Sequence, residues 1–441
     1  MGTFIHSRWL GEPMSGVPRT ERRSCEYDAY VPDLLTDRSF RLDGAVAADV
    51  GDAEAAIAGL DARVAALTDT EALARLLLRA ESVASSRIEG LEIGPRRLLR
   101  AEAARQIGEV PGDITAEEVL GNIDAMRCAL DKAESADAIT TDALLEIHNC
   151  LLRETRLRAY AGQIRDVQNW VGGNIYNPCA ADYVPPPPEH VRPLMDDLAE
   201  FCNSDMLPVV AQAAIAHAQF ETIHPFADGN GRAGRALIHL ILRRRRLSTR
   251  VQPPISLILA TRAEDYVRGL TEFRFDGPSG SDAAHAGLNV WVGTFAAACV
   301  RAVEGAIAFE ERCRTIEDGW RASLGRVRAG SSVDLLLRML PGTPIISVRS
   351  AMTALARSKP QVNDAVARLE AAGILKQVTV GRRNRAFEAA TVIEAFADLE
   401  RQLASPAGDT LTASPMRPVP ARRQGERPAG GRGRRLPAQP G

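Results

Sequence analysis

Several kinds of feature are missing from this chain of 441 residues. Its N-terminus has no apolar core of a signal peptide, and position six is His6, where a myristoylation motif needs serine or threonine. The longest apolar run near its most distinctive motif, residues 236–242, is far too short to span a bilayer. We therefore expect no contact with membranes and a cytoplasmic location.

Paired cysteines and a strong net charge are also missing. The seven cysteines contain no C-x-x-C pair, which argues against a disulfide framework and against a zinc site, so we expect free thiols in a reducing compartment. The formal net charge of −2 argues against the whole molecule being a nucleic-acid or membrane binder, although a local basic patch stays possible. With 45% hydrophobic residues, the composition is that of an ordinary globular protein of two or three domains.

The most informative stretch that is present is residues 224–235, His-Pro-Phe-Ala-Asp-Gly-Asn-Gly-Arg-Ala-Gly-Arg. The apolar run 209–223 predicts a helix that ends at the His-Pro step, and residues 236–246 predict a second helix. Between them, Gly229 and Gly231 allow a tight turn that points successive N–H groups at one spot. The dipole of the following helix also favours an anion there. The backbone pattern therefore predicts a site for phosphate.

The side chains of this stretch suit the same purpose. Arg232 and Arg235 are three positions apart, so they share one face of the helix and can both bond phosphate oxygens. Asp228 supplies one carboxylate, and one carboxylate with substrate phosphates is the usual way to hold Mg²⁺. His224 is the natural proton acceptor beside them. The stretch is suited to bind a polyphosphate with Mg²⁺ and to deprotonate a nearby hydroxyl group.

This string resembles the signature of the Fic family, H-P-F-x-[D/E]-G-N-G-R-x-x-R, and matches every fixed position. The resemblance implies a protein adenylyltransferase, a nucleotidyltransferase that moves AMP from ATP to a Ser, Thr or Tyr hydroxyl of a target protein or of itself. The roles we assign are the base His224, the Mg²⁺ ligand Asp228, the charge-stabilising Gly229, Asn230 and Gly231, and the phosphate-orienting Arg232 and Arg235. Phe226 is expected to point inward and anchor the stretch.

Residues 85–90 carry a second motif. By itself, Ser-Ser-Arg-Ile-Glu-Gly would be a solvated helix end with a glycine cap. With the first motif, it resembles the inhibitory motif [S/T]-x-x-x-E-[G/N] of Fic proteins, with Ser85, Glu89 and Gly90 at the fixed positions. In that family the glutamate pairs with the second arginine, here Arg235, and denies it to the ATP γ-phosphate. The resemblance implies that the chain carries its own inhibitor.

Two segments near the motif are expected to contact substrates. Residues 161–188 predict an irregular hairpin or a surface loop, and they resemble the Fic flap, which pairs its main chain with an extended segment of the target. Residues 254–259 and 263–270 supply an apolar wall near the nucleotide. Relatives often have a tyrosine where Leu257 stands, and we assign Leu257 to nucleotide binding. We interpret His217, upstream of the motif, as a packed core residue.

The fold class we expect is mostly α-helical: a Fic (Fido) core with a β-hairpin flap and a C-terminal winged helix-turn-helix domain. Residues 1–50 predict an irregular arm, and 288–314 predict a long helix that braces the core. The expected parts are the arm and inhibitory helix (1–110), the catalytic core (111–315), the winged-helix domain (316–392) and a disordered tail (393–441) that is rich in Pro, Gly and Arg from about Ser405.

The winged-helix prediction depends on three helical segments followed by a short strand, 376–380, and the basic turn 381–385. In such a domain Lys359, Gln361 and Asn363 would face a DNA groove while the arginines of the turn contact phosphate. The same fold also serves protein contact or dimerisation, so DNA and a homodimer are both candidate partners.

Two other functions stay open at this level. The same loop can serve another transfer or removal, such as a different nucleotide's monophosphate, a phosphoryl group, or hydrolysis of AMP from a target. Alternatively, the chain is a DNA-binding regulator that uses its core as a nucleotide sensor.

Overall fold

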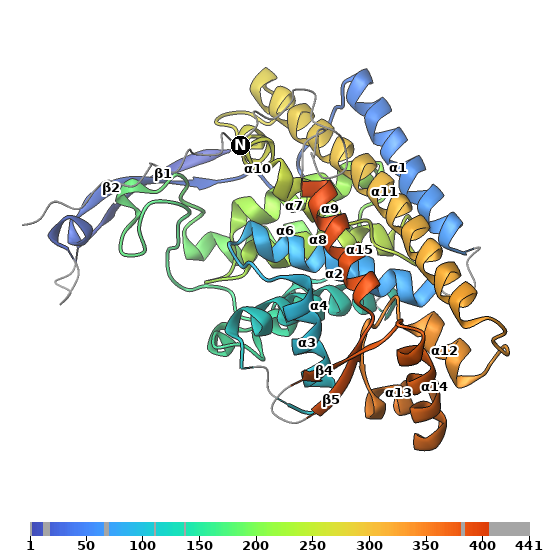
Figure 1. Ribbon diagram of the computed structural model, residues 1–441. Helices are drawn as coiled ribbons and strands as arrows, with labels where there is room; N and C mark the ends of the chain where they lie inside the picture. The colour runs from blue at the N-terminus through green and yellow to red at the C-terminus, as the bar shows by residue number, and fades with distance from the viewer. Residues whose placement is uncertain are drawn as a thin grey trace, which may run out of the picture. The chain divides into compact units, whose positions relative to one another are not determined.

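The computed structural model describes residues 2–11, 18–65, 70–109, 112–135, 138–380 and 384–404, and helices make up most of this part of the chain (Figure 1). The helices up to residue 324 are α1 (Gly44–Ala65), α2 (Thr70–Ile88), α3 (Pro95–Gln106), α4 (Ile114–Ser135), α5 (Thr141–Leu152), α6 (Pro188–Asn203), α7 (Val209–Ile223), α8 (Asn230–Arg244), α9 (Ile255–Thr261), α10 (Ala263–Phe273) and α11 (Asp282–Leu324). The expectation of a mostly α-helical fold is confirmed.

Helix α7 lies at the centre of this arrangement. Almost every residue from Val210 to Ile223 is buried, which agrees with a sequence that is apolar on all faces of the helix. Helix α8 packs against α7 and also against α4 and α5, so its N-terminal residues are held from several sides. The motif stretch therefore joins two helices that the core holds in place, and both of its ends are fixed by them.

Helix α11 is longer than the predicted 288–314. Ser281 caps its N-terminus by accepting a hydrogen bond from the N–H of Ala284, and the helix runs without a break past position 314. It packs along α1, α7, α9 and α10, and the indole N–H of Trp291 donates to the Ala214 carbonyl at 2.7 Å. Among the described residues it is the one helix that could cross a membrane by length and composition, yet 50% of its most apolar window is buried inside the protein.

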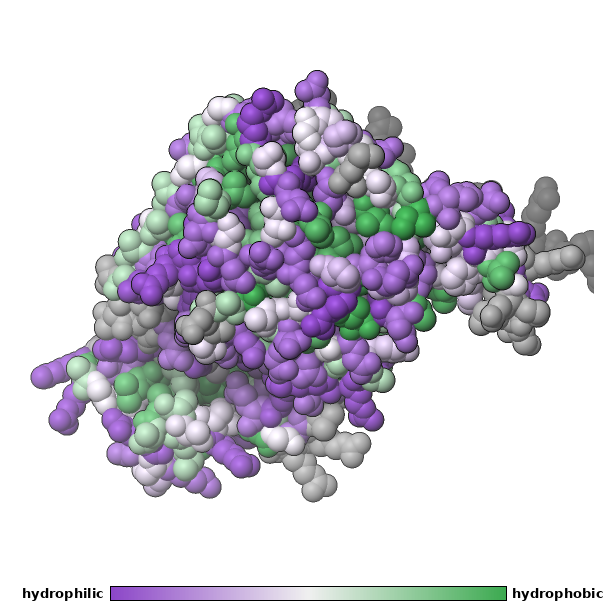
Figure 2. All heavy atoms as spheres, turned by 180° about the vertical axis from the view of Figure 1, so that it is seen from behind, coloured by the Kyte–Doolittle hydropathy of each residue, from purple (hydrophilic) through white to green (hydrophobic). Residues whose placement is uncertain are grey.

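The face shown in Figure 2 is mostly hydrophilic, with apolar residues in scattered patches rather than in one belt. This mixture is ordinary for a protein surface, because polar groups never cover all of it.

The prediction of an irregular N-terminal arm is wrong. The arm contains an antiparallel hairpin of β1 (Thr3–Trp9) and β2 (Cys25–Val31), with a 3-10 turn η1 (Arg19–Arg22) between them. Side chains in both strands alternate in exposure, a pattern of period two that is typical of a strand pair. At the end of the hairpin, the Tyr30 hydroxyl donates to the Phe275 carbonyl at 2.7 Å and so ties β2 to the helical core.

Cys25 and Cys179 form a disulfide, and this corrects the expectation that all thiols are free. The bond joins β2 to the 3-10 turn η3 (Pro178–Ala180) across a sequence separation of 154 residues. Figure 1 shows the two strands beside the segment 161–187 that η3 belongs to. The prediction went wrong because neither cysteine has a partner nearby in the sequence.

Residues 161–188 form no regular β-hairpin, and of the two predicted alternatives they are closer to the surface loop. The 3-10 turn η2 (Arg158–Tyr160) precedes the segment. The segment itself contains the 3-10 turn η3 and one isolated antiparallel bridge between Val171 and Tyr183. Hydrogen bonds from side chains to the main chain take the place of the bonds between two strands. Asn174 accepts from two N–H groups, and Asn177 caps η3. Asparagine and glycine favour such local bonds over pairing with a second strand.

The C-terminal part consists of helices around a small antiparallel sheet. Its elements are α12 (Ser332–Met339), β3 (Ile345–Ser347), α13 (Val348–Leu355), α14 (Lys359–Ala371), β4 (Lys376–Val380), β5 (Asn384–Glu388) and α15 (Ala390–Ala404), with the strands in the order β3-β5-β4. The predicted strand 376–380 is present, and the winged-helix assignment stays a prediction. Helix α15 continues to Ala404, so the expected disorder from position 393 is wrong up to there. Residues 405–441 lie outside the described residues.

This part is closely joined to the helical core. The predicted boundaries at 315 and 392 fall inside the continuous helices α11 and α15, and one hydrophobic cluster runs from α1 through α15. Arg79 of α2, which is buried, pairs with Glu102 of α3 and donates to the Gly342 carbonyl at 2.6 Å. The helix that carries the predicted inhibitory motif is therefore fixed to the C-terminal part.

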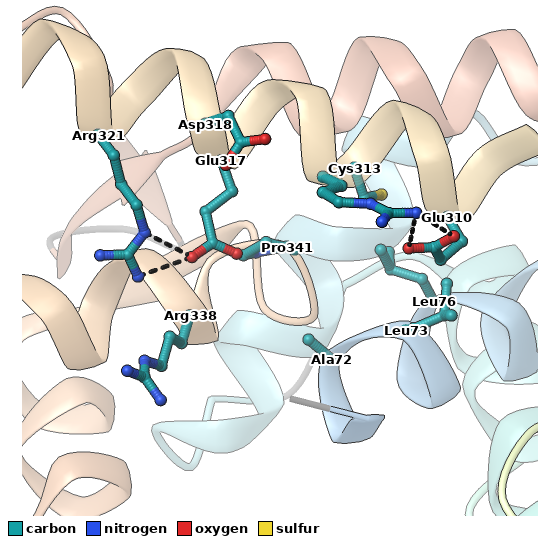
Figure 3. Close-up of a pocket in the computed structure, with 11 residues that line it drawn as sticks. Ala72, Leu73, Leu76, Glu310, Cys313, Glu317, Asp318, Arg321, Arg338 and Pro341 are labelled. Carbon is teal, nitrogen blue, oxygen red and sulfur yellow. Dashed lines mark hydrogen bonds and ion pairs between the residues drawn. The ribbon is translucent and has the colours of Figure 1, made fainter. Parts of the chain in front are cut away.

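A cavity of about 330 Å³ lies where α2, α11 and α12 meet. In Figure 3, Leu73 and Leu76 of α2 form one wall, and Arg321 points toward Glu317 on α11. Part of its charged lining is paired within the protein: Arg321 also contacts Asp334 at 2.9 Å. None of its described lining residues comes from the motif stretch, so this cavity is separate from the candidate site.

Candidate active site

The backbone of the motif stretch turns sharply at two positions. Helix α7 ends at His224, which adopts a left-handed conformation with φ 50° and ψ 59°, and α8 begins after Gly229, with φ 81°. Glycine adopts this conformation freely, whereas for histidine it costs about 1–2 kcal/mol. Strain of this kind is found at functional sites, where the surrounding structure enforces it.

Arg165 enforces the first turn. Its guanidinium is buried and donates to the carbonyls of His224 at 2.9 Å, Ile223 at 3.4 Å and Val167 at 3.1 Å. A cation at the last carbonyls of a helix satisfies groups that have no partner within the helix and complements the dipole. Burial lowers the pKa of Arg165 to about 10, so it stays charged. The sequence analysis did not find this role, which depends on a contact 59 residues along the chain.

Asn230 and His148 hold the middle of the stretch. The Asn230 side chain accepts from the N–H of Phe226 and donates to its carbonyl, both at 2.8 Å, so the loop closes on itself. The ring of Phe226 is buried, as predicted, and stacks on that of His148 at 3.7 Å between centroids. Our prediction assigned Asn230 to charge stabilisation, and the structure shows its side chain engaged with the loop backbone.

The His148 imidazole is fixed at both nitrogens. Nδ1 accepts from the N–H of Gly162 at 3.1 Å, which leaves the proton on Nε2 to donate to the Asp228 carbonyl at 2.9 Å. Burial lowers the pKa of His148 to about 4, so the neutral ring keeps this arrangement at ordinary pH. Sequence reasoning missed this residue, because a histidine on an amphipathic helix carries no signal of its partner.

The first arginine of α8 is only partly satisfied. Nη2 of Arg232 donates to Asp228 Oδ1 at 2.8 Å, and the arginine side chain is 4% exposed against 48% for the aspartate. Within the described residues, Nε and Nη1 of Arg232 have no hydrogen-bond partner although they are buried. Buried donors without a partner are rare and suggest a ligand that supplies the acceptors. Asp228 reaches toward solvent, where a cation has access to it.

The second arginine, Arg235, is bound by the motif of α2. Nε donates to Ser85 Oγ at 2.9 Å, and Nη2 donates to the Ser85 carbonyl at 2.8 Å and to Glu89 Oε1 at 2.6 Å. The arginine side chain is 1% exposed and the glutamate 35%. Nη1 also donates to the hydroxyl of Tyr266, which lies 2.9 Å from Nε2 of the buried His217. The contact that the resemblance implied is thus present in the structure.

The Glu89 carboxylate lies at the N-terminus of α8. A Cβ at Gly231 would lie only 2.0 Å from Oε1 of Glu89, so the carboxylate rests directly on the glycine backbone. Burial alone would raise the pKa of Glu89, but Arg235 outweighs it by charge and hydrogen bonding, and the pKa is lowered. Gly90 follows with φ 77° and ends α2. An ionised carboxylate therefore occupies the position that the helix end offers to an anion.

The His224 imidazole stands half-buried beside this position. Burial is the main cause that lowers its pKa to about 4, against a smaller opposite effect of Glu89. Its Nδ1 is buried, and a contact with the main chain of Glu221 also acts to raise the pKa. The ring is therefore neutral at ordinary pH, with a lone pair available to accept a proton. Close by, burial raises the pKa of Glu221 to about 7.

The remaining predicted residues lie outside this constellation. Leu257 is 1% exposed in α9, within the hydrophobic cluster of the core, and its contact with a nucleotide stays a prediction. Lys359, Gln361 and Asn363 are exposed on α14, where Gln361 accepts from the Ser358 N–H at its N-terminus. Most of the basic turn, 381–383, lies outside the described residues, so DNA contact also stays a prediction.

Comparison with known proteins agrees with this geometry. Residues 138–242 match the model of the Fic/DOC family, and residues 47–131 match that of the Fic/DOC family N-terminal region. The chain belongs to the Fic/DOC family and is a distant homologue of protein adenylyltransferases of the Fic type. The matched N-terminal region contains the Ser85–Gly90 motif, and the matched Fic region contains the loop up to Arg235.

The relatives are similar over part of their length. Protein adenylyltransferase fic-1 of Caenorhabditis elegans is 34% identical over 165 residues, which is 36% of this chain and 29% of the relative. Protein adenylyltransferase Fic of Nematostella vectensis is 33% identical over 31% of each chain. A Fic family protein from Desulfovibrio desulfuricans is 22% identical, with a TM-score of 0.49 over 79% of this chain and 97% of that one. The chain thus covers less than a third of these curated relatives.

Proposed function

We propose that this chain is a protein adenylyltransferase that transfers AMP from ATP to a hydroxyl side chain of a target protein and of itself, and that Glu89 inhibits it. The observation that carries the proposal is the place of the Glu89 carboxylate. It lies at the N-terminus of α8, bound to Arg235 and beside the unsatisfied Arg232, where a phosphate of a nucleotide would find its donors.

The transfer step assigns one task to each group. The target hydroxyl oxygen attacks the α-phosphorus of ATP, the bond from that phosphorus to the oxygen bridging to the β-phosphate breaks, and pyrophosphate leaves. The neutral His224 imidazole accepts the hydroxyl proton, which its lowered pKa permits. The main-chain N–H groups at the start of α8 stabilise the charge on the phosphoryl group. Arg235, once free of Glu89, orients the terminal phosphates.

The residues present fit a magnesium ion. Asp228 is half exposed and keeps a carboxylate oxygen that Arg232 does not bond, and hard oxygen ligands are those that Mg²⁺ prefers. Buried donors of Arg232 without a partner indicate that phosphate oxygens complete the same position. When bound, the ion would neutralise charge on the phosphates. Asp228 itself is held by Arg232 and, through its carbonyl, by His148.

Inhibition follows from competition for one cation. A charge-assisted hydrogen bond between a buried arginine and a partly exposed carboxylate contributes about 1.5–3 kcal/mol. Its loss changes the occupancy of a competent nucleotide pose by about 10- to 100-fold. The carboxylate also fills space beside Gly231, so a nucleotide phosphate and Glu89 cannot lie there together.

The test uses the full chain and ATP labelled at the α-phosphate. We expect Glu89→Gly to raise self-modification and modification of proteins in a cell lysate, whereas Glu92→Gly, which removes an exposed carboxylate three residues away, leaves both unchanged. Mass spectrometry should find the mass of one AMP on a hydroxyl side chain. Equal labelling in all three proteins would contradict the inhibitory role.

The same assay separates the other reactions of this loop. Label carried from the γ-phosphate rather than the α-phosphate would show phosphoryl transfer. Release of AMP from a previously modified target, without labelling, would show the removal reaction. Either result would replace the proposed transfer while leaving the anion site in place.

A further inference from the structure

Two thiols and a carboxylate meet between α4 and α5, outside the candidate active site. Cys128 comes from α4, and Glu146 and Cys150 come from α5. Glu146 and Cys150 are four residues apart and share a face of α5, whereas His148 between them projects from the opposite face toward the loop. The cluster and the loop are therefore on two sides of the same helix.

The ligand atoms are close enough to share one ion. The sulfur atoms of Cys128 and Cys150 and a carboxylate oxygen of Glu146 all lie within 4.8 Å of one another. With a zinc–sulfur distance of about 2.3 Å, two sulfur atoms of a tetrahedral site lie about 3.8 Å apart. Cys150 Sγ is 3.9 Å from Glu146 Oε1, and Cys128 Sγ lies within 4.8 Å of a ligand atom of each, so the three atoms are within about 1 Å of the separations that a shared zinc ion needs.

Two cations and an opening to solvent lie beside the cluster. Lys132, one turn after Cys128 on α4, and Arg153, just beyond the end of α5, are the cations that act on the two sulfur atoms. Cys128 and Glu146 are partly exposed, which gives an ion and a water molecule access.

We propose that Cys128, Glu146 and Cys150 bind one Zn²⁺ ion, with water as the fourth ligand. Two thiolates and a carboxylate form a borderline-soft set that fits Zn²⁺, whereas Mg²⁺ and Ca²⁺ prefer oxygen alone and Cu(I) prefers sulfur alone. Binding displaces the thiol protons and joins α4 to α5. Because α5 also holds His148 against the loop, the ion stabilises the helix that positions the active-site turn.

The experiment uses Co²⁺ as a spectroscopic probe on the full chain, stripped with a chelator and kept reduced with a phosphine. We expect one equivalent to produce a thiolate-to-cobalt charge-transfer band, and Zn²⁺ to abolish it by displacement. Cys128→Ser and Cys150→Ser should lose the band, and Glu146→Gln should bind at least about tenfold more weakly. Cys313→Ser, a partly exposed cysteine outside the cluster, should behave as the wild type. Ions at Asp228 give no such band, because that site has no thiolate.

Thermal unfolding gives a second readout. Zn²⁺ should raise the Tm of the wild type and of Cys313→Ser, but not that of Cys128→Ser. The proposal is overturned by a band that survives in both cluster variants and disappears in Cys25→Ser, which would place the ion on the reduced Cys25–Cys179 pair. It is equally overturned by the absence of any band at micromolar Co²⁺, or by a Cys128–Cys150 disulfide in the protein as purified.

Discussion

The two ends of the loop between α7 and α8 are both built around a buried arginine, but the two arginines have different partners. At the C-terminus of α7, Arg165 bonds main-chain carbonyls, among them that of His224. At the N-terminus of α8, Arg235 bonds Ser85 and the carboxylate of Glu89. One end uses its cation to complete a helix, and the other has its cation occupied by a side chain that is 35% exposed.

This difference separates a fixed element from one that can change. The carbonyls around Arg165 cannot leave, because they belong to the backbone that forms the turn. The Glu89 carboxylate can leave by rotating its side chain, and the Ser85 contacts would then still hold Arg235 in place. We therefore expect substitutions at the α7 end to change folding and chemistry, and substitutions at Glu89 to change regulation.

The largest effect should follow from His224→Ala. Removal of the proton acceptor should lower the rate of AMP transfer in the Glu89→Gly background by about 100- to 10,000-fold, while nucleotide still binds. Single-turnover labelling and nucleotide titration measure the two quantities separately. His190→Ala, on α6, is the control. Full activity of the His224 variant would remove the base from the proposed mechanism.

The next effect concerns the fixed end. Arg165→Met leaves several buried carbonyls without a donor and should lower the free energy of unfolding by about 2–4 kcal/mol. Urea denaturation measures it. Arg268→Met provides the comparison, since Arg268 is exposed and, in the described part of the chain, pairs with Asp265 of its own helix. If the two variants were equally stable, the turn would not depend on Arg165.

A smaller effect is expected at the N-terminus of α8, where Glu89 can leave Arg235. Glu89→Gly should raise the affinity for magnesium nucleotide by about 10- to 100-fold, because Arg235 becomes available. Equilibrium binding of a fluorescent ATP analogue measures this change. The free energy of unfolding of Glu89→Gly should change much less than that of Arg165→Met. Glu89→Gln should give an intermediate affinity, since it keeps the volume and removes the charge.

The smallest effect concerns pH. Burial lowers the pKa of His224 to about 4, and Glu89→Gly removes a negative charge that raises this pKa. The base therefore stays neutral, and transfer by Glu89→Gly should not decline between about pH 8 and about pH 5.5 through protonation of His224. The Glu89 pKa is lowered too, so the contact with Arg235 in the wild type persists over this range and is lost only at more acid pH. An acid limb near the ordinary histidine pKa would contradict the burial argument.

Sequence alone located the residues of the loop and of the α2 motif, because both are defined by short spacings. Pro225 and the two glycines determine where α7 ends and α8 begins, and these are local effects. The pairing of Glu89 with Arg235 came from family resemblance, since nothing in the spacing of two residues 146 apart indicates a contact.

Long-range contacts account for what the sequence did not reveal. His148 and Arg165 position the loop through main-chain atoms, which leave no pattern in the side chains. The Cys25–Cys179 disulfide and the α4–α5 thiol cluster likewise join distant segments. The hairpin expected at 161–188 failed for a local reason, because asparagine side chains there bond the backbone in place of a second strand.

The central claim is that Glu89 occupies the position of a nucleotide phosphate, and a crystal structure of Glu89→Gly with a magnesium complex of a non-hydrolysable ATP analogue tests it most directly. We predict phosphate oxygens at the N-terminus of α8, bonded to Arg235 and to the free donors of Arg232, with the α-phosphate facing His224. A nucleotide bound elsewhere, or an empty helix end at saturating nucleotide, would contradict the account.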